Sequence, residues 1–373
     1  DLRGVVLQLP PRTVPAVDAF EISKPRREAG SSPLSLPVVD RMVVQRPAAA
    51  LPGDVRYAAL AGELRLRRDG ETWSVRIADL LLDRDEERTT SRATVAANWR
   101  GKAATTFGLH AYASRLRLDD AWPLVLAFAP RSFDRWAGLA PSGEIRQLRA
   151  EVLRSRAGAV PRVEFSANVA GLGVDAVGHW PGISGLTASV SGTDEHGRIG
   201  LRSSEVAFDL PRRFRAPIAG LAASGEIDWH RDGRAWVFGS RAVEVSQGEA
   251  RARGSFEFTT GRGAASPLLT LAAEVQDFDM ARVAGVLPVN RLKPRTLAWL
   301  DGAFVQGRVV RGRVDYRGPV RKFPFRGGEG EFKATADVRD ATLVYFDGFM
   351  PVTGAAGQVT FHNAGLEARV SEA

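Results

Sequence analysis

A hairpin-like phrase that occurs twice constrains this chain more than any other feature. Residues 62–75 read GELRLRRDGETWSV, and residues 225–238 read GEIDWHRDGRAWVF. In both, polar and apolar residues alternate over the length of a strand, Arg-Asp-Gly gives a turn signal, and the alternation then resumes. A period of two places successive side chains on opposite faces of a sheet. The pattern therefore predicts a β-hairpin that the chain builds twice.

The same alternation recurs along most of the chain. It predicts strands at 163–169, 186–192, 196–201, 205–210, 252–258, 268–275, 312–318, 331–338, 341–346 and 357–370. Thirty-eight glycines and 21 prolines punctuate the sequence. Helical spacing is confined to 119–139 and 279–304, and an internal proline is expected to split each of these segments into two short helices.

After each copy of the hairpin phrase comes a helical insert, and after each insert comes a strand that begins with glycine. The repeated unit is therefore larger than the hairpin alone. It spans roughly residues 60–150 and again 223–315, with a further β segment between them. We expect a mostly β fold, an elongated, curled antiparallel sheet of repeated hairpin units with two short helical inserts. The expected regions are an irregular Pro-rich leading segment at 1–50, a first β-groove region at 51–222 and a second at 223–373.

About twenty strands with one apolar face each need a cover for that face, and two short helical inserts are too few. Two sheets can pack as a sandwich, the sheet can close into a barrel, or it can curl into a trough that holds an apolar ligand. Repetition favours the trough, because stacked repeats extend at about 4.8 Å per strand. Alternation alone does not separate a dry sandwich core from a filled groove.

On the trough interpretation, the apolar positions of the strands line the inside and contact the ligand. These positions are Leu64, Leu66, Val75, Ile77, Phe165, Val190, Phe208, Ile227, Trp229, Val243, Val245, Phe256, Phe258, Leu269, Leu271, Val314, Tyr316, Phe332, Leu343, Tyr345, Val359 and Phe361. The tryptophans Trp73, Trp236, Trp136 and Trp299, in contrast, recur with the repeat and are interpreted as structural anchors.

The formal charge of +8 and the pI near 10.3 raise the question of a nucleic acid or an anionic membrane as partner. The arginines alternate along strands, as in LRLRR at 64–68 and RGRVDYRG at 311–318, instead of forming a block. Alternation places them on one sheet face, where a solvated surface is the simpler interpretation. No aromatic-basic RNA-binding motif or recognition-helix pattern occurs, so we expect no nucleic acid partner.

No run of eighteen or more apolar residues occurs, so this stretch contains no predicted membrane-spanning helix. The absence of cysteine excludes disulfides, thiolate metal sites and cysteine nucleophiles. The sequence has neither a signal peptide nor an initiator methionine. We expect it to be a piece of a longer protein, with an anchor or targeting signal outside this stretch.

No catalytic arrangement is found. The glycine-rich segments 261–263 and 327–331 lie between strands without the Lys-Ser/Thr and helix of a phosphate loop, so they are interpreted as turns. The acidic run DRDEER at 83–88 lacks the spaced ligands of a calcium loop and is interpreted as a solvated hairpin tip. The histidines are scattered, at His110, His179, His196, His230 and His362. We expect a protein that is not an enzyme and has no metal and no cofactor.

The C-terminal third resembles the AsmA-like superfamily, and most closely its YhdP-type proteins. The motifs that carry the resemblance are the P-x-x-L-x-W-L helix from Pro294 to Leu300, the Gly307 and Gly312 strand, Gly318-Pro319, Phe323-Pro324-Phe325, Glu331-Phe332, the A-x-L-x-Y strand from Ala341 to Tyr345, Pro351, and the F-x-N-x-G-L close from Phe361 to Leu366. ELRLRRDGETWSVRIADLLLD and LAPSGEIRQLRAEV extend the likeness over nearly everything after residue 50. One departure is Met350, where the family usually has tryptophan.

The resemblance implies a periplasmic protein of Gram-negative bacteria, held in the inner membrane by a helix that this stretch lacks. It implies repeating β-groove units that shield phospholipid acyl chains during inner-to-outer membrane transport and so support envelope integrity. The lining positions above would then bind lipid, with headgroups at the lip, where arginines are candidates for favouring anionic ones. Phospholipid and the inner membrane are the implied partners, a contact with the outer membrane is left open, and protein partners are unknown.

A second interpretation remains open from the residues themselves. A closed array of β-sandwiches would form a structural or interaction scaffold of the cell envelope that carries no lipid. An apolar stripe confined to one sheet face favours the groove, whereas apolar residues on both faces, or a closed core, favour the scaffold.

Overall fold

The fold is taken from a computed structural model of the chain. It describes residues 39–46, 49–51, 55–57, 59–83, 91–101, 105–128, 136–178, 180–212, 214–261, 265–286, 294–344 and 350–372. The chain divides into two compact units. Unit 1 comprises Asp1–Leu172 with Ser191–Asp194, and unit 2 comprises Gly173–Val190 with Glu195–Ala373.

Unit 1 contains seven strands of an antiparallel sheet in the described residues. They are β1 (Val39–Arg46), β4 (Ala59–Asp69), β5 (Thr72–Asp83), β6 (Ser91–Arg100), β7 (Thr106–Arg117), β8 (Ser142–Arg154) and β9 (Arg162–Val174), with helix α1 (Leu118–Phe128) between β7 and β8. β1 pairs with β4, and each following strand pairs with the next through β8. The short strands β2 (Ala49–Leu51) and β3 (Val55–Tyr57) form a separate pair.

Unit 2 is also built of antiparallel strands. It includes the last two residues of β9, and β10 (Gly182–Thr193) is divided between the units. Its other described strands are β11 (His196–Asp209), β12 (Ile218–Asp232), β13 (Ala235–Gln247), β14 (Ala250–Thr259), β15 (Leu268–Asp279), β16 (Phe304–Pro319), β17 (Glu331–Leu343), β18 (Val352–His362) and β19 (Gly365–Glu372). The helical segments are η2 (Met280–Arg282), α2 (Val283–Val286), α3 (Pro294–Ala303) and η4 (Val320–Lys322). From β11 to β19, every strand pairs antiparallel with the next.

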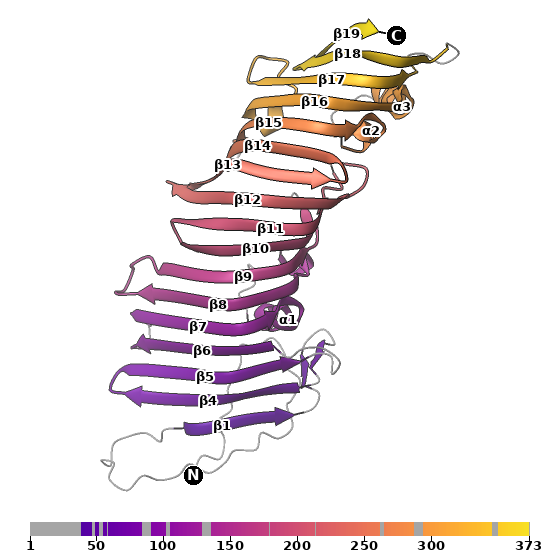
Figure 1. The fold of residues 1–373 in the computed structure, drawn as a ribbon. Coiled ribbons are helices and arrows are strands. Elements are labelled where there is room, and N and C mark those ends of the chain that lie inside the picture. Colours follow the sequence, from indigo (N-terminus) through magenta and orange to yellow (C-terminus); the bar gives the residue numbers. More distant parts are fainter. Residues whose placement is uncertain are drawn as a thin grey trace. The chain divides into compact units, whose positions relative to one another are not determined.

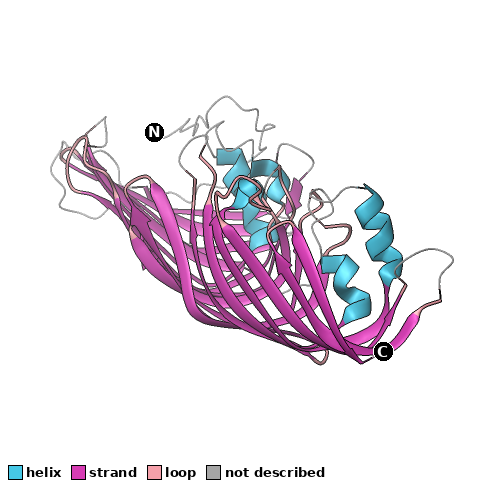
Figure 2. Cartoon of the chain, turned by 90° about the horizontal axis from the view of Figure 1, so that it is seen from above, coloured by secondary structure: helices cyan, strands magenta, loops and turns pink. Residues whose placement is uncertain are grey.

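Sequence neighbours are therefore sheet neighbours within each unit (Figure 1). β16 has 16 residues, about 53 Å at 3.3 Å per residue, and β14 has 10. The strands of unit 2 bend into a trough, and helices lie on its concave side (Figure 2). The predicted fold class, a curled antiparallel sheet of hairpin units with two short helical inserts, is confirmed.

Both copies of the repeated phrase form the predicted hairpin. Two-residue loops follow Asp69 and Asp232, and they connect β4 to β5 and β12 to β13. Gly70 and Gly233 begin these loops with φ of 56° and 57°, a left-handed conformation in which glycine has no Cβ to clash. Loops of this length match the right-handed twist of the strands that they join.

Two pairs of predicted strands are single strands that contain a bulge. The segments 196–201 and 205–210 both belong to β11, and 331–338 and the start of 341–346 both belong to β17. The register of β17 shifts between Val338 and Ala341, where Asp340 has φ of 53°. A bulge inserts one residue and changes the phase of the alternation, so the sequence pattern divides one strand into two.

Bulges of this kind lie side by side in unit 2. Asp277 of β15 has φ of 54° and Gly307 of β16 has φ of 135°, and the register of β16 against β17 is irregular. Because a bulge bends its strand and increases the local twist, a line of bulges curves the sheet.

The helical inserts differ in one detail from the prediction. In 279–304 the helix is divided as expected, into η2 with α2 and then α3. In 119–139, α1 continues through Pro123, and the second piece is a 3-10 turn at 136–139. Pro123 removes one N–H from the helix but does not break it, and α1 ends at Phe128, two residues before Pro130, so the segment still gives two helical pieces, the second of which is a 3-10 turn.

The two-unit division lies near residue 172, whereas the predicted boundary at 222/223 lies inside β12. The boundary inferred from the repeat stays a prediction, as do the regions 1–50, 51–222 and 223–373. The run 84–88 of the acidic cluster and the lining position Tyr345 lie outside the described residues.

The buried core of unit 2 lies where the helical insert meets the sheet. Met280 of η2 packs with Val309, Val338, Ala341 and Ala355. Since the helices of unit 2 lie on the concave side, these residues identify the concave face as the apolar one. In unit 1, α1 is anchored by polar contacts instead, because the Ser91 hydroxyl lies 2.9 Å from the buried Asp120 carboxylate.

We predict that Gly307→Ala destabilises the protein. A Cβ at Gly307 would lie 2.9 Å from the Met280 sulfur and 2.9 Å from the Ala341 Cα, and φ at this position is 135°. The free energy of unfolding from urea titration should fall by about 2–4 kcal/mol. The control Gly302→Ala in α3 has nothing within 4 Å, and the free energy should stay equal or rise by up to about 1 kcal/mol. Equal values for the two variants would contradict this account of the bulge.

Candidate functional site

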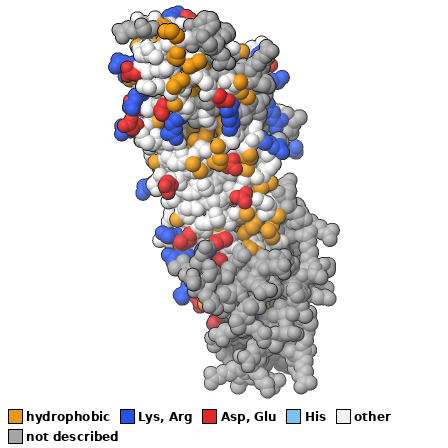
Figure 3. Space-filling model, turned by 90° about the vertical axis from the view of Figure 1, so that its right-hand side faces the viewer, with side chains coloured by type: hydrophobic (Ala, Val, Ile, Leu, Met, Phe, Trp, Pro, Cys, Tyr) orange, Lys and Arg blue, Asp and Glu red, His pale blue; other side chains and the backbone are white. Residues whose placement is uncertain are grey.

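Rows of apolar side chains cross the strands on the concave face of unit 2. Residues paired across antiparallel strands share a face, so the register defines the rows. Three rows are Trp229, Phe238, Phe258 and Leu269; Phe256, Leu271, Tyr316 and Phe332; and Val245, Ala252, Val275, Gly312, Ala336 and Val359. In the upper part of Figure 3, hydrophobic side chains form a band with charged ones to either side.

Unit 1 has the same construction on one face of its sheet. Its rows are Trp73, Trp99 and Phe107; Leu66, Val75, Ala97, Leu109 and Val152; and Leu64, Ile77, Val95, Ala111 and Ala150. The rings of Trp73 and Trp99 stack with centroids 6.4 Å apart. In both units, therefore, an apolar stripe runs perpendicular to the strands.

The opposite face is mostly polar and rich in ion pairs. Arg253 of β14 lies 3.5 Å from Glu244 of β13, and Arg313 lies 2.8 Å from Asp315 within β16. The hydrogen bond from Arg313 lowers the pKa of Asp315 below its ordinary value. Because most arginines alternate with the apolar positions, most of the charge predicted from the sequence faces water on the side away from the stripe.

The predicted lining positions are neither core nor fully exposed. All but three are half-buried. Trp229 is buried, with 8% of its surface exposed, Phe361 is 37% exposed, and Tyr345 lies outside the described residues. A closed sandwich core would remove most such side chains from water. Partial exposure of so many neighbouring apolar groups marks a face that protein covers only in part.

Most of the lining positions lie together, and three lie apart from the rows. Within unit 1, Leu64 pairs with Ile77 and Leu66 with Val75. The positions from Ile227 to Phe361 lie on the apolar face of unit 2, apart from Tyr345. The exceptions, on β9, β10 and β11, are Phe165, Val190 and Phe208.

Some of these positions are covered by other parts of unit 2. Leu343 and Val359 pack against the core under η2. At the other end of the strands, Tyr316 lies 5.2 Å from the ring of Phe325, and Phe332 lies 5.2 Å from that of Phe323. Between these two covers, positions such as Leu271 and Val314 are half-buried.

Several residues of the stripe were not predicted. Trp99, Leu109 and Val152 in unit 1, and Phe238 and Val275 in unit 2, belong to the rows. The alternation of polar and apolar residues also predicts these positions as lining. In β6 and β7, however, many positions on the apolar face are alanines, and this makes the alternation harder to recognise in the sequence.

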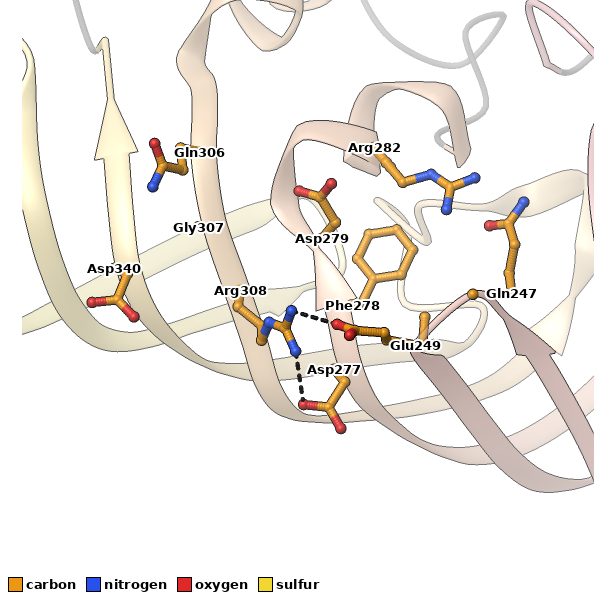
Figure 4. A pocket seen from close by; sticks show the side chains of 12 residues that line it. Gln247, Glu249, Asp277, Phe278, Asp279, Arg282, Gln306, Gly307, Arg308 and Asp340 are labelled. Atoms are coloured by element: carbon orange, nitrogen blue, oxygen red, sulfur yellow. Dashed lines mark hydrogen bonds and ion pairs between the residues drawn. The ribbon is translucent and has the colours of Figure 1, made fainter.

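A polar cleft of about 450 Å³ lies in unit 2 beside the helical insert (Figure 4). Arg308 contributes a guanidinium nitrogen 2.6 Å from Glu249 and another 3.6 Å from Asp277. The hydrogen bond to Glu249 raises the pKa of Arg308 above its ordinary value. Asp279 accepts a hydrogen bond from the Ala281 N–H and caps η2. These contacts stabilise the bulges and the helix start at the edge of the stripe.

In the part of the chain that the structure describes, no three His, Asp or Glu side chains are grouped so that they could hold a metal ion. Among the same residues, no helix has both the length and the apolar character needed to cross a membrane. Among the described residues, the apolar stripe is an extended arrangement of like side chains, and it suits binding of an apolar molecule.

Comparison with known proteins gives two findings. Residues 51–373 match the family described as YhdP protein. The chain is 23% identical over 249 residues to the "Intermembrane phospholipid transporter YhdP" of Escherichia coli (strain K12), an alignment that covers 67% of this chain and 19% of that protein. The chain thus spans about a fifth of the relative's length. No solved structure matches.

We predict that Glu144→Gln weakens unit 1 in a pH-dependent way. The Glu144 carboxylate lies 2.8 Å from Arg146 and 2.6 Å from Arg115. The hydrogen bond from Arg146, with help from Arg115, lowers the pKa of Glu144. A carboxyl whose pKa is lower in the folded than in the unfolded protein stabilises the fold above its unfolded pKa and loses this effect as pH falls through the folded pKa.

Because both arginines are solvent-exposed and water screens the pairs, the loss in free energy of unfolding at pH 7 should be at most about 1 kcal/mol, and it should be smaller at pH 3 than at pH 7. Urea titrations at both pH values measure the difference. Glu164→Gln is the control, since Glu164 is an exposed carboxylate of β9. A loss of the same size at pH 3 would mean that Glu144 acts through packing instead.

Proposed function

The chain belongs to the YhdP family, and from this premise we propose that it shields phospholipid acyl chains in its apolar stripe during transport between the inner and outer membranes. The E. coli relative is described as an intermembrane phospholipid transporter, which supports phospholipid as the cargo. The proposed place of action is the periplasm of a Gram-negative bacterium, with an inner-membrane anchor in a part of the protein outside this stretch.

The observation that carries the proposal is the one-sided apolar face. Trp229, Phe258 and Leu269 lie in rows on the concave side, while Arg253 and Asp315 lie on the opposite side. Since the lining is only half-buried, apolar surface remains for a ligand. Acyl chains supply the cover that the protein's own helices do not.

The binding free energy of an acyl chain along the stripe suits a ligand that moves, instead of one that is held at a single site. Burial of each methylene is worth about 0.8 kcal/mol, so an acyl chain gains several kcal/mol from the stripe. The nine strands from β11 to β19 extend about 38 Å at 4.8 Å per spacing, whereas one leaflet of a bilayer core is about 15 Å thick. Neighbouring positions in the stripe are chemically equivalent, so a bound chain can move between them without a large barrier and without catalysis.

A structural scaffold of the envelope is the competing function. It would need the apolar face to be closed by protein, and the half-buried lining does not favour that arrangement. The two functions differ in one measurable property, because only the groove carries lipid.

We predict that this chain, purified from a Gram-negative host, carries several phospholipids as measured by native mass spectrometry and lipid extraction. The double variant Val243→Asp with Phe256→Asp should lose at least half of them. Each new carboxylate lies among apolar neighbours, where an ionised group costs several kcal/mol beside a hydrocarbon chain.

The matched control is Ser255→Asp with Thr270→Asp, which adds the same charge on the polar face of β14 and β15. It should retain the lipid of the unmodified chain. Circular dichroism and the unfolding midpoint verify that both variants are folded. A folded, monodisperse, lipid-free unmodified chain would favour the scaffold, and equal lipid content in the two variants would exclude these residues from the lining.

A further inference from the structure

We propose that the two repeated hairpins each carry a subsite for the phosphate of a phospholipid headgroup, formed by Arg68 with Trp73 and by Arg231 with Trp236. The inference rests on the proposed lipid-carrying function and names the part of the lipid that each hairpin recognises. It assigns a binding role to Trp73 and Trp236, which the repeat had suggested only as structural anchors, and to the arginines beside them.

The register places both arginines on the apolar side of the sheet. Arg68 pairs with Trp73 and, two residues away on the same strand, Leu66 pairs with Val75. Arg231 pairs with Trp236 in the same way, next to the pair of Trp229 and Phe238. Side chains two residues apart share a face. Each arginine therefore stands at the turn end of its strand, beside an apolar row.

The same backbone contact holds both guanidinium groups. Arg68 Nε donates a hydrogen bond of 3.0 Å to the Gly70 carbonyl, and Arg231 Nε donates one of 3.0 Å to the Gly233 carbonyl. The Arg68 guanidinium carbon also lies 5.1 Å from the centre of the Trp73 ring. With Nε engaged in this way, the two terminal nitrogens form the edge that matches two phosphate oxygens.

The charge of these arginines is not matched by a carboxylate. Arg65, on the other face of the same strand, lies 2.6 Å from Glu63, and Arg198 lies 2.8 Å from Asp228. Neither Arg68 nor Arg231 forms an ion pair with another described residue. Two exposed cations without carboxylate partners thus occur at equivalent places in the repeat, each beside apolar rows.

This combination fits an amphipathic ligand better than a fully apolar or a fully polar one. Tryptophan is suited to an interface because its ring is apolar and its N–H is polar. Arg68 lies two residues from Leu66 on the same face, so an acyl chain on Leu66 and Val75 can place its headgroup beside it. The arginine then binds the phosphate, and the tryptophan contacts the glycerol region.

The test compares two lipids with the same acyl chains. Uptake of phosphatidylglycerol and of diacylglycerol from vesicles of phosphatidylcholine is measured for the whole chain by mass spectrometry. In the variant Arg68→Gln with Arg231→Gln, we expect the ratio of phosphatidylglycerol to diacylglycerol to fall about tenfold while diacylglycerol uptake stays equal. Arg68→Lys with Arg231→Lys should keep most of the preference for phosphatidylglycerol, because lysine retains the positive charge. Lysine cannot make the Nε hydrogen bond to the glycine carbonyl, so this variant separates the charge from that contact.

The control removes two exposed arginines from the other face, Arg67→Gln with Arg251→Gln, and should leave the ratio unchanged. A ratio unchanged by the Gln variant overturns the proposal, as does an equal fall in the control, which would indicate net charge alone. If the Lys and Gln variants lose the preference for phosphatidylglycerol equally, the charge of the arginines is not what binds the phosphate. Their role would then be to hold the hairpin through the Nε hydrogen bond, and the proposal would be overturned.

Soluble glycerol 3-phosphate distinguishes a lipid headgroup from a free anion. It should not displace phosphatidylglycerol at millimolar concentration, because it lacks the acyl chains that the rows bind. Displacement by this compound would overturn the assignment to a lipid. If the unmodified chain takes up neither lipid, the proposed function itself fails, whereas uptake of both lipids with no effect of the arginines refutes only the headgroup subsites.

Discussion

The structure depends on one constraint, which is that a long antiparallel sheet with one apolar face must have that face covered. The chain keeps this face consistent from strand to strand, so that rows such as Phe256, Leu271 and Tyr316 continue through the hairpins. Its own cover is small, since the described helices meet the sheet at the strand ends and Met280 forms the centre of the main buried cluster. The apolar surface left between these ends is the reason for proposing a lipid as the missing cover.

Bulges reconcile a regular pattern with a curved sheet. Without them, strict alternation over 13 to 16 residues would give long and nearly straight strands, and a flat sheet would not form a trough. At Asp277, Gly307 and Asp340 the strands change phase, so that residues beyond the bulge return to the apolar side. The bulges therefore supply curvature and keep Val309 and Ala341 facing the helical insert.

Charge is distributed according to face and position. On the polar face, several arginines pair with neighbouring carboxylates, as Arg313 does with Asp315, and the sheet stays hydrated there. On the apolar side, at the turn ends of their strands, Arg68 and Arg231 are held by glycine carbonyls instead. A cation that the fold holds in place without neutralising it is suited to bind an anion from outside, so the same residue type serves solubility on one face and recognition on the other.

The sequence by itself determined the hairpins, the curled antiparallel fold and most of the apolar face, because alternation with a period of two directly encodes which side chains share a side. It predicted Leu64 with Ile77 and Phe256 with Leu271 as lining, and these are cross-strand partners. Only the tertiary structure decided where β11 and β17 bulge, which alanine-rich strands join the face, and that Arg68 and Arg231 lack carboxylate partners. Those properties depend on the register between strands, and register is set by cross-strand contacts that no local pattern contains.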